Sequence, residues 1–210
     1  KDGGMAEATT IVKVRNTTSG TLYMDEYWTG EHYLYGSVLV PEDVTLTILP
    51  GTKVIVDRTS TGDGYGHSLL VKGNLVIEGG FLGATFCSIN PEGFGWEGIY
   101  LEGQAQIDGL SLSQAMRGIT VTDNGTLNIT NSVLNHNFLG IHCFSQHVVV
   151  LNTHFSNNTW YGLKEEGGGR PEVHNCIFSN NGTHYYHVEK TDLTETELNA
   201  LAGNEGNKYD

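Results

Sequence analysis

The chain has 210 residues, and its 24 aspartates and glutamates against 11 lysines and arginines give a formal net charge of −13. This charge excludes the basic surface with which proteins neutralise nucleic-acid phosphates, and it disfavours attachment to anionic membranes. No stretch approaches the roughly 18 consecutive apolar residues that cross a bilayer. We therefore expect no nucleic-acid partner and no transmembrane segment.

The glycine and cysteine contents describe a folded domain that does not depend on disulfides. Glycine supplies 28 residues while 38% of the chain is hydrophobic, and this combination predicts many tight turns around a core. The three cysteines, Cys87, Cys143 and Cys176, cannot all pair, and their spacing fits no zinc pattern. We expect three free thiols that pack as small apolar side chains.

The second half of the chain repeats with a period near 22 residues. Four segments align on a glycine followed by isoleucine or leucine, at Gly98, Gly118, Gly140 and Gly162. A second set of apolar residues recurs in the same way, at Leu112, Leu134, Phe155 and Phe178. A period of this length indicates a solenoid, in which each repeat is one turn and stacking of turns buries the core.

Each repeat contains three short stretches in which apolar residues alternate with polar ones. In the repeat that starts at Gly118, the apolar members are Ile119 and Val121, Leu127 and Ile129, and then Leu134 after Ser132. A period of two sends alternate side chains to one face of a β-strand. The pattern therefore predicts three strands per turn and about six turns between residues 38 and 178.

Asparagine recurs at two places in each repeat. One column, between the second and third predicted strands, contains Asn131, Asn152 and Asn175. Asparagine tolerates the left-handed backbone of a sharp bend, and its amide can bond its copy in the next turn. We expect this column to form an inward-facing amide ladder. A second polar column follows the third strands and contains Asn137, Asn158 and Asn181.

These features resemble the right-handed parallel β-helix of the pectin-lyase-like superfamily. The resemblance covers about residues 20–187 and rests on three motifs: VLVPEDVTLTILPGTKVIV at 38–56, FSNN at 155–158 and 178–181, and WEGI at 96–99. It implies an all-β, single-stranded right-handed parallel β-helix of about six coils, each with three short strands. These motifs point to the fold and not to an activity.

We expect a single domain over residues 1–210. An N-terminal strand cap spans 1–32, the coils span 33–187, and a C-terminal cap or tail spans 188–210. Thr194 and Glu197 form a capping box, which predicts a short capping helix over about 195–202 that ends at Gly203. The chain ends in polar sequence, which is compatible with a fragment of a longer protein.

The resemblance also indicates where catalytic groups would lie. In catalytic relatives, polysaccharides are cleaved on the outer face of the sheet whose strands follow each glycine here. Hydrolysis there needs two close carboxylates, whereas Glu102 and Glu166 are three turns apart, or about 14 Å. Lys164, His142 and Glu166 make the best acid–base group on this face. A solvated end of the solenoid explains them equally, and we assign no catalytic residue.

A binding function fits the sequence better. The connections that lead back to the first strand of each turn are rich in aromatic residues, and flat rings can stack on sugars while neighbouring side chains supply hydrogen bonds. The candidate carbohydrate-binding residues are Trp96, Tyr100, His142, Trp160 and Tyr161. The alternative is that these rings only pack against the flank of the column.

Metal and cofactor motifs are weak. Asp57 and Asp63 could contribute to a calcium site, but two carboxylates fall short of the six to eight oxygens that calcium takes. The five histidines between 136 and 174 fall in different columns, so they do not converge on one ion. We expect no cofactor, with calcium at the two aspartates as the alternative.

Two functional hypotheses remain. The first is a non-catalytic extracellular or envelope-associated module, structural or glycan-binding, whose partner is a polysaccharide or cell-surface glycan. The second is a polysaccharide lyase or glycoside hydrolase of the same superfamily. Both place the protein outside the cytoplasm, as a secreted, periplasmic or cell-surface protein.

Overall fold

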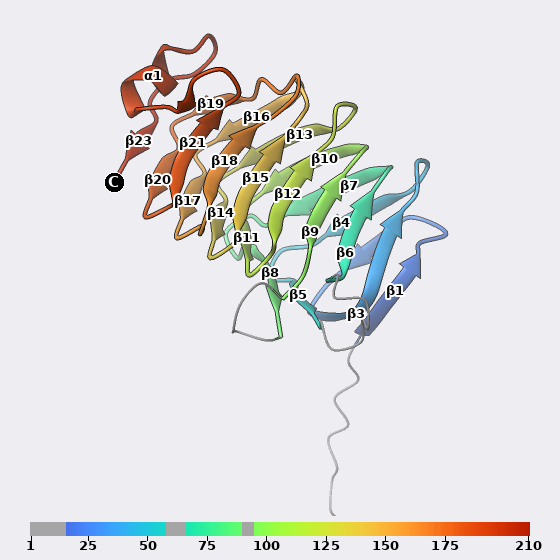
Figure 1. The fold of residues 1–210 in the computed structure, drawn as a ribbon. Helices are drawn as coiled ribbons and strands as arrows, with labels where there is room; N and C mark the ends of the chain where they lie inside the picture. Colours follow the sequence, from blue (N-terminus) through green and yellow to red (C-terminus); the bar gives the residue numbers. More distant parts are fainter. Residues whose placement is uncertain (1–15, 58–65, 90–94) are drawn as a thin grey trace, which may run out of the picture.

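The computed structural model describes residues 16–57, 66–89 and 95–210, and it forms one elongated column of stacked coils (Figure 1). Each coil passes through three strands, and the equivalent strands of successive coils pair in parallel. Six complete coils of three strands run from the second half of β3 to β20. The predicted parallel β-helix is therefore confirmed.

The strands form three columns along the axis. The first column contains the second half of β3 (Glu31–Val40), β6 (Ser68–Val71), β9 (Gly98–Leu101), β12 (Arg117–Val121), β15 (Leu139–Cys143), β18 (Tyr161–Glu165) and β21 (Thr183–His187). At its start, β1 (Asn16–Thr21) pairs with both halves of β3. The second column contains β2 (Glu26–Trp28), β4 (Thr45–Ile48), β7 (Asn74–Glu78), β10 (Gln104–Asp108), β13 (Thr126–Thr130), β16 (Val148–Leu151) and β19 (Glu172–His174). The third column contains the first half of β3, β5 (Lys53–Val56), β8 (Ala84–Ser88), β11 (Leu110–Ser113), β14 (Val133–Asn135), β17 (His154–Ser156), β20 (Ile177–Ser179) and β23 (Lys208–Tyr209).

The first and third columns belong to one sheet because β3 runs through both. Its first half pairs with β5 and its second half with β6. The second column is a separate seven-stranded sheet. At the far end of the column, β22 (Thr191–Asp192) pairs antiparallel with β21.

Inward side chains stack on their copies along the axis. One predicted column pairs in register from β9 to β18 and is buried throughout, at Ile99, Ile119, Ile141 and Leu163. The other predicted column is likewise buried, and the rings of Phe155 and Phe178 stack at 4.8 Å with an interplanar angle of 8°. This stacking buries apolar surface at every step, which is the main favourable term in folding.

The three cysteines are free, as predicted. Burial raises the pKa of the Cys143 thiol to about 12 and that of Cys176 to about 11. Both groups therefore stay protonated at neutral pH, and they pack as small apolar side chains.

The asparagine column between the second and third strands does not face inward, and that prediction is wrong. Asn131, Asn152 and Asn175 are exposed and have φ values of 51°, 49° and 52°. The left-handed backbone forms the bend and turns each side chain outward. Asn152 Nδ2 donates to Asn131 Oδ1 at 3.4 Å, so the ladder exists, but it lies in solvent.

The buried amide ladder is the second polar column, which follows the third strands. Asn158 is fully buried, and its Oδ1 accepts hydrogen bonds from the backbone N–H and Nδ2 of Asn137, both at 3.1 Å. Its own Nδ2 donates to Asn181 Oδ1 at 2.8 Å and to the Leu134 carbonyl at 3.0 Å. These bonds satisfy backbone groups at the inner corner where the chain turns toward the next coil.

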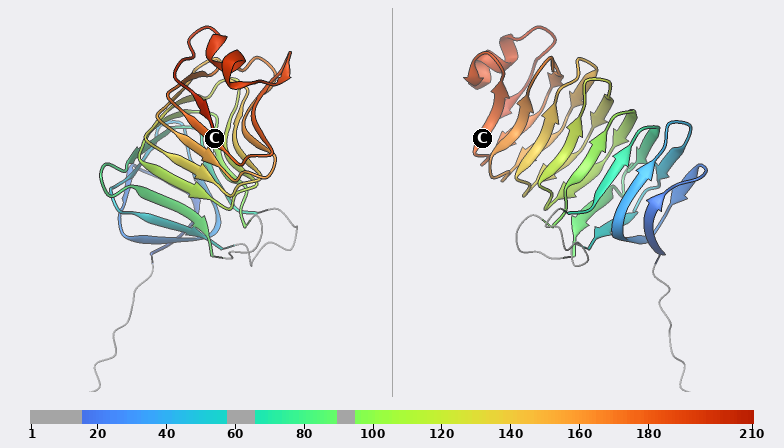
Figure 2. Two further views of the ribbon diagram at one scale, coloured as in Figure 1. Left: turned by 90° about the vertical axis from the view of Figure 1, so that its left-hand side faces the viewer. Right: turned by 45° about the vertical axis from the view of Figure 1, so that its right-hand side comes forward.

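A short helix, α1 (Glu195–Ala200), covers the last coil (Figure 2). Thr194 accepts from the backbone of Glu197, whose carboxylate accepts in return, so the predicted capping box is present. Leu198 is fully buried beneath the helix. A hydrophobic cap of this kind prevents the last coil from exposing its interior.

Substitution of Ile141 by aspartate should unfold the domain. Its side chain lies between Ile119 and Leu163 with no polar partner, so an ionised carboxylate there would lose several kcal/mol of solvation. We expect loss of the cooperative thermal transition in circular dichroism. Gln104→Asp, which adds the same charge at an exposed position of β10, should leave the transition within about 2 °C of wild type. A fully cooperative Ile141→Asp protein would refute the register.

Substitutions in the two asparagine ladders should reduce the stability of the protein by different amounts. Asn158→Ala leaves several buried groups without partners and should cost roughly 2–5 kcal/mol. Asn152→Ala should cost only about 1 kcal/mol, because the loss there is the strain of alanine at positive φ. Asn152→Gly removes that strain and should be nearly neutral. Denaturant unfolding measures all three, and equal costs at 152 and 158 would contradict this distinction.

Candidate functional site

The outer face of the first column presents a continuous line of side chains. Tyr100, Thr120, His142, Lys164 and Tyr186 pair in register on five successive strands from β9 to β21. Neighbouring strands are about 4.8 Å apart, so each of these residues lies directly beside the next along the axis. Along this line, β9 and β12 present hydroxyl groups, whereas β15 and β18 present the nitrogen atoms of His142 and Lys164.

Three titratable groups meet at the end of β18. Glu166 Oε2 accepts from Lys164 Nζ at 2.6 Å and lies 2.7 Å from His142 Nε2. The side chains of His142 and Lys164 are 12% and 15% exposed, whereas that of Glu166 is 46% exposed. The ring of Phe144 packs against His142 at 4.3 Å. The structure thus assembles the acid–base group suggested by the sequence.

The charges of this group follow from its contacts. Hydrogen bonds from Lys164 and then from His142 lower the pKa of Glu166, so its carboxylate is ionised at neutral pH. Burial lowers the pKa of His142, although its bond to Glu166 acts in the opposite direction. At neutral pH the imidazole is therefore uncharged and donates its Nε2 proton to the carboxylate. Within the described chain, His142 Nδ1 is buried and has no hydrogen-bond partner.

Aromatic rings surround the lysine of this group. The Lys164 ammonium lies 5.5, 5.9 and 5.6 Å from the centroids of three rings, those of Trp160, Tyr161 and Tyr186. Distances below about 6 Å are those of cation–π contacts. Trp160 also packs on Phe138 at 5.2 Å, yet it remains 44% exposed. We call Trp160, Tyr161, Lys164, Glu166 and Tyr186 the aromatic–lysine cluster.

The five predicted carbohydrate-binding residues do not lie together. His142, Trp160 and Tyr161 belong to or touch the aromatic–lysine cluster, while Tyr100 is 41% exposed on the same face three strands away from Lys164. Trp96 is only 1% exposed, and its Nε1 donates to the Ser113 carbonyl at 3.0 Å. Its ring belongs to the core beside Phe86 and has no surface for a ligand, so its placement on the exposed flank is corrected.

The predicted calcium pair cannot be placed as a pair. Asp57 is 8% exposed at the end of β5, and Asp63 lies outside the described residues. In the described ranges, no group of three or more histidine, cysteine or acidic side chains is arranged to hold a metal ion.

Other charged residues on this outer face form two separate salt bridges. Arg117 lies 3.6 Å from Glu97, and Lys72 lies 3.4 Å from Glu102. Thr122 and Phe144 occupy the two coils between Glu102 and Glu166, as their backbone bonds to the preceding strands show. The two carboxylates therefore do not meet across one bond of a bound sugar.

A second titratable group lies inside the coil directly beneath the cluster. Glu165 is 1% exposed in an inward column, and Tyr185 donates a short hydrogen bond to its Oε1. Its Oε2 lies 3.5 Å from His187 Nε2 and 3.7 Å from Arg170. His187 Nδ1 accepts the backbone N–H of Glu189, which places the ring proton on Nε2, toward the carboxylate.

The sequence analysis did not include Tyr186 among the candidate carbohydrate-binding residues, and it missed the Glu165 group. Tyr186 follows from the register, because it stands one strand beyond Lys164 in the outward line. Glu165 could have been found from the repeat pattern. It is a charged residue at an inward position, and Cys143 occupies the equivalent position in the preceding coil.

These observations define a parallel β-helix protein with a polar and aromatic cluster on the outer face of one strand column. A family model described as a right handed beta helix region matches residues 97–206. This match covers just over half of the sequence, and the chain belongs to the right-handed β-helix family. No curated protein and no solved structure matches it significantly. In the described part, no helix is long and apolar enough to span a membrane.

Stability should fall with rising pH through the titration of Glu165. Burial raises the pKa of this carboxyl above its ordinary value of 4.5, so the folded protein holds a proton that the unfolded chain has released. The contribution is complete below pH 4.5 and is lost as pH rises to the folded pKa. Glu165→Gln should remove this decline, which is about 1.4 kcal/mol per unit of pKa difference.

Arg170→Met should have the opposite effect. It removes a partner of the ionised carboxylate, so the decline should become larger. Thermal unfolding from pH 4 to 8 measures both variants, and Glu189→Gln, which removes the exposed second partner of Arg170, is the control. A Glu165→Gln profile parallel to that of wild type would contradict the assignment.

Proposed function

We propose that this protein is a non-catalytic glycan-binding module that acts outside the cytoplasm, and that it binds saccharides at the aromatic–lysine cluster. The single observation that carries the proposal is the exposed indole of Trp160, next to a carboxylate and an ammonium group on one open face. The structural alternative, in which the rings only pack, explains Tyr161 at 9% exposure but does not explain why the indole of Trp160 remains 44% exposed.

The chemistry of the cluster suits a sugar. The flat face of an indole covers the C–H groups of a pyranose ring, and a few placed polar groups then fix its orientation. Glu166 is ionised and half-exposed, so it can accept hydrogen bonds from sugar hydroxyls while Lys164 donates to ring or hydroxyl oxygens. Tyr100 extends the same face by a further exposed ring.

The same geometry favours binding over cleavage. Glu166 has a lowered pKa and two donors on one oxygen, so it cannot hold the proton that a general acid gives to a leaving group. Lys164 Nζ already donates to Glu166 and lies within cation–π distance of three rings. Glycoside hydrolysis needs two carboxyl groups about 5–10 Å apart, and Glu102 stands three coils from Glu166.

The net charge of the protein restricts the class of saccharide that we expect it to bind. A net charge of −13 repels free polyanions at long range. The expected ligand is therefore a neutral polysaccharide or cell-surface glycan, or an acidic one bridged by a cation. Such polymers lie outside the cytoplasm, in agreement with a secreted, periplasmic or cell-surface location.

Glycan-array screening followed by calorimetry on the hits tests the proposal. Trp160→Ala should weaken binding by at least about tenfold and leave the melting temperature within a few degrees of wild type. Tyr23→Ala is the matched control, because it removes a ring that is 89% exposed at the opposite end of the column. Equal effects of the two variants, or joint loss of binding and stability in Trp160→Ala, would favour a packing role.

A reducing-end and unsaturated-product assay on each hit tests the enzymatic alternative. We expect no product. Release of sugar ends that is abolished by Lys164→Ala or Glu166→Ala would replace the binding proposal with a catalytic one.

A further inference from the structure

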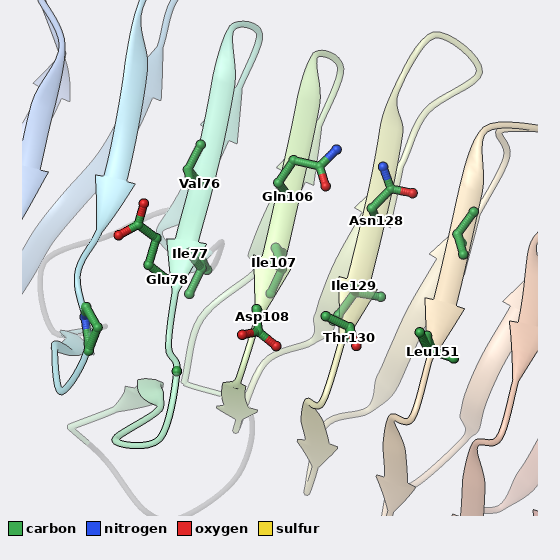
Figure 3. A pocket seen from close by; sticks show the side chains of 13 residues that line it. Val76, Ile77, Glu78, Gln106, Ile107, Asp108, Asn128, Ile129, Thr130 and Leu151 are labelled. Carbon is green, nitrogen blue, oxygen red and sulfur yellow. The ribbon is translucent and has the colours of Figure 1, made fainter.

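A shallow groove of about 540 Å³ crosses the outer face of the second strand column. It lies over β7, β10, β13 and β16, and Figure 3 shows its side chains on these neighbouring strands. The aromatic–lysine cluster is on the first column instead, so the groove is a separate feature of the molecule. Pro50 and Gly80, from the turns beside β4 and β7, line one end of it.

The groove has an aliphatic and amide floor. One line of outward residues pairs in register across the four strands, at Val76, Gln106, Asn128 and Val149. The amides of Gln106 and Asn128 lie side by side in Figure 3. A primary amide offers both a donor and an acceptor, which matches the two hydrogen-bonding groups of a peptide unit.

Two carboxylates stand along one edge of the groove. Glu78 and Asp108 occupy paired positions on neighbouring strands, whose backbones are about 4.8 Å apart. Figure 3 shows the carboxylate of Glu78 turned toward β4 and away from that of Asp108. The same line continues to Thr130 and Leu151. No lysine, arginine or histidine is among the described residues that line the groove, so the lining itself does not neutralise this pair.

The exposed asparagine ladder holds one of these carboxylates. Asn131 Nδ2 donates to Asp108 Oδ1 at 2.8 Å, and Asn152 in turn donates to Asn131 at 3.4 Å. The bond fixes the orientation of Asp108 and occupies only one of its oxygens. The ladder therefore keeps an anionic group in place at the groove edge.

We propose that this groove binds an extended segment of a basic polypeptide. The floor amides bond its backbone, Glu78 and Asp108 each receive a separate lysine or arginine, and Val76, Val149 and Leu151 contact its aliphatic side chains. Charge complementarity selects this partner, because the groove presents acidic groups on a protein with a net charge of −13. A saccharide suits it less, since no aromatic ring lines it in the described part of the chain.

Titration with a synthetic peptide in which lysines alternate with valine and serine tests the proposal. We expect saturable binding by fluorescence anisotropy that weakens strongly between 0.1 and 1 M salt. A peptide with glutamate in place of every lysine should not bind. The double variant Glu78→Gln/Asp108→Asn keeps the side-chain shapes and the bond from Asn131, and it should weaken binding about tenfold.

The control must remove the same charge elsewhere. Glu42→Gln/Asp43→Asn changes two exposed carboxylates in the turn between β3 and β4 and should bind the peptide as wild type does. Trp160→Ala should also bind it normally, which distinguishes failure of this proposal from failure of the glycan proposal. Absence of peptide binding, equal loss in both double variants, or displacement of the peptide by a neutral gluco-oligosaccharide would each overturn the inference.

Discussion

The structure depends on one constraint, the parallel hydrogen-bonding of each coil to the next at a fixed strand spacing. Because the spacing is about 4.8 Å, every side chain stacks on the residue at the equivalent position of the neighbouring coil. Most inward positions are therefore apolar, as at Ile119 and Ile141. The buried Glu165 is an exception and accepts a hydrogen bond from Tyr185. Where the chain turns, the same spacing lets Asn137, Asn158 and Asn181 bond one another and satisfy the buried backbone.

The same constraint places residues that are far apart in the sequence next to one another on the surface. Lys164 belongs to the aromatic–lysine cluster because His142 lies on the strand before it and Tyr186 on the strand after it. The adjacent residues Glu165 and Glu166 point to opposite faces of β18 and have opposite electrostatics. Burial raises the pKa of the inner carboxyl, whereas hydrogen bonds lower that of the outer one. Two adjacent carboxyls near the end of one strand thus have opposite pKa shifts because one is buried and the other is hydrogen-bonded at the surface.

The two outer faces differ in chemistry. The first column combines rings with lysine, arginine and histidine, and we propose that it binds saccharides. The second column has aliphatic side chains, amides and two carboxylates, and we propose that it binds basic polypeptide. A module with both surfaces could join a glycan to a protein without catalysing a reaction, and a rigid solenoid holds such surfaces at a constant angle to each other.

The sequence by itself determined the coils. Alternating apolar residues with a period near 22 specify three strands per turn, and strand side chains have no other way to bury that pattern. The inward register, the free cysteines and the capping box followed from local rules in the same way. Tertiary structure decided the direction of side chains at the bends: the left-handed φ of Asn131 turns it outward, while Asn158 turns inward. It also decided that Trp96 is buried and Trp160 exposed, because that depends on how each connection packs against the neighbouring coil, which local sequence does not encode.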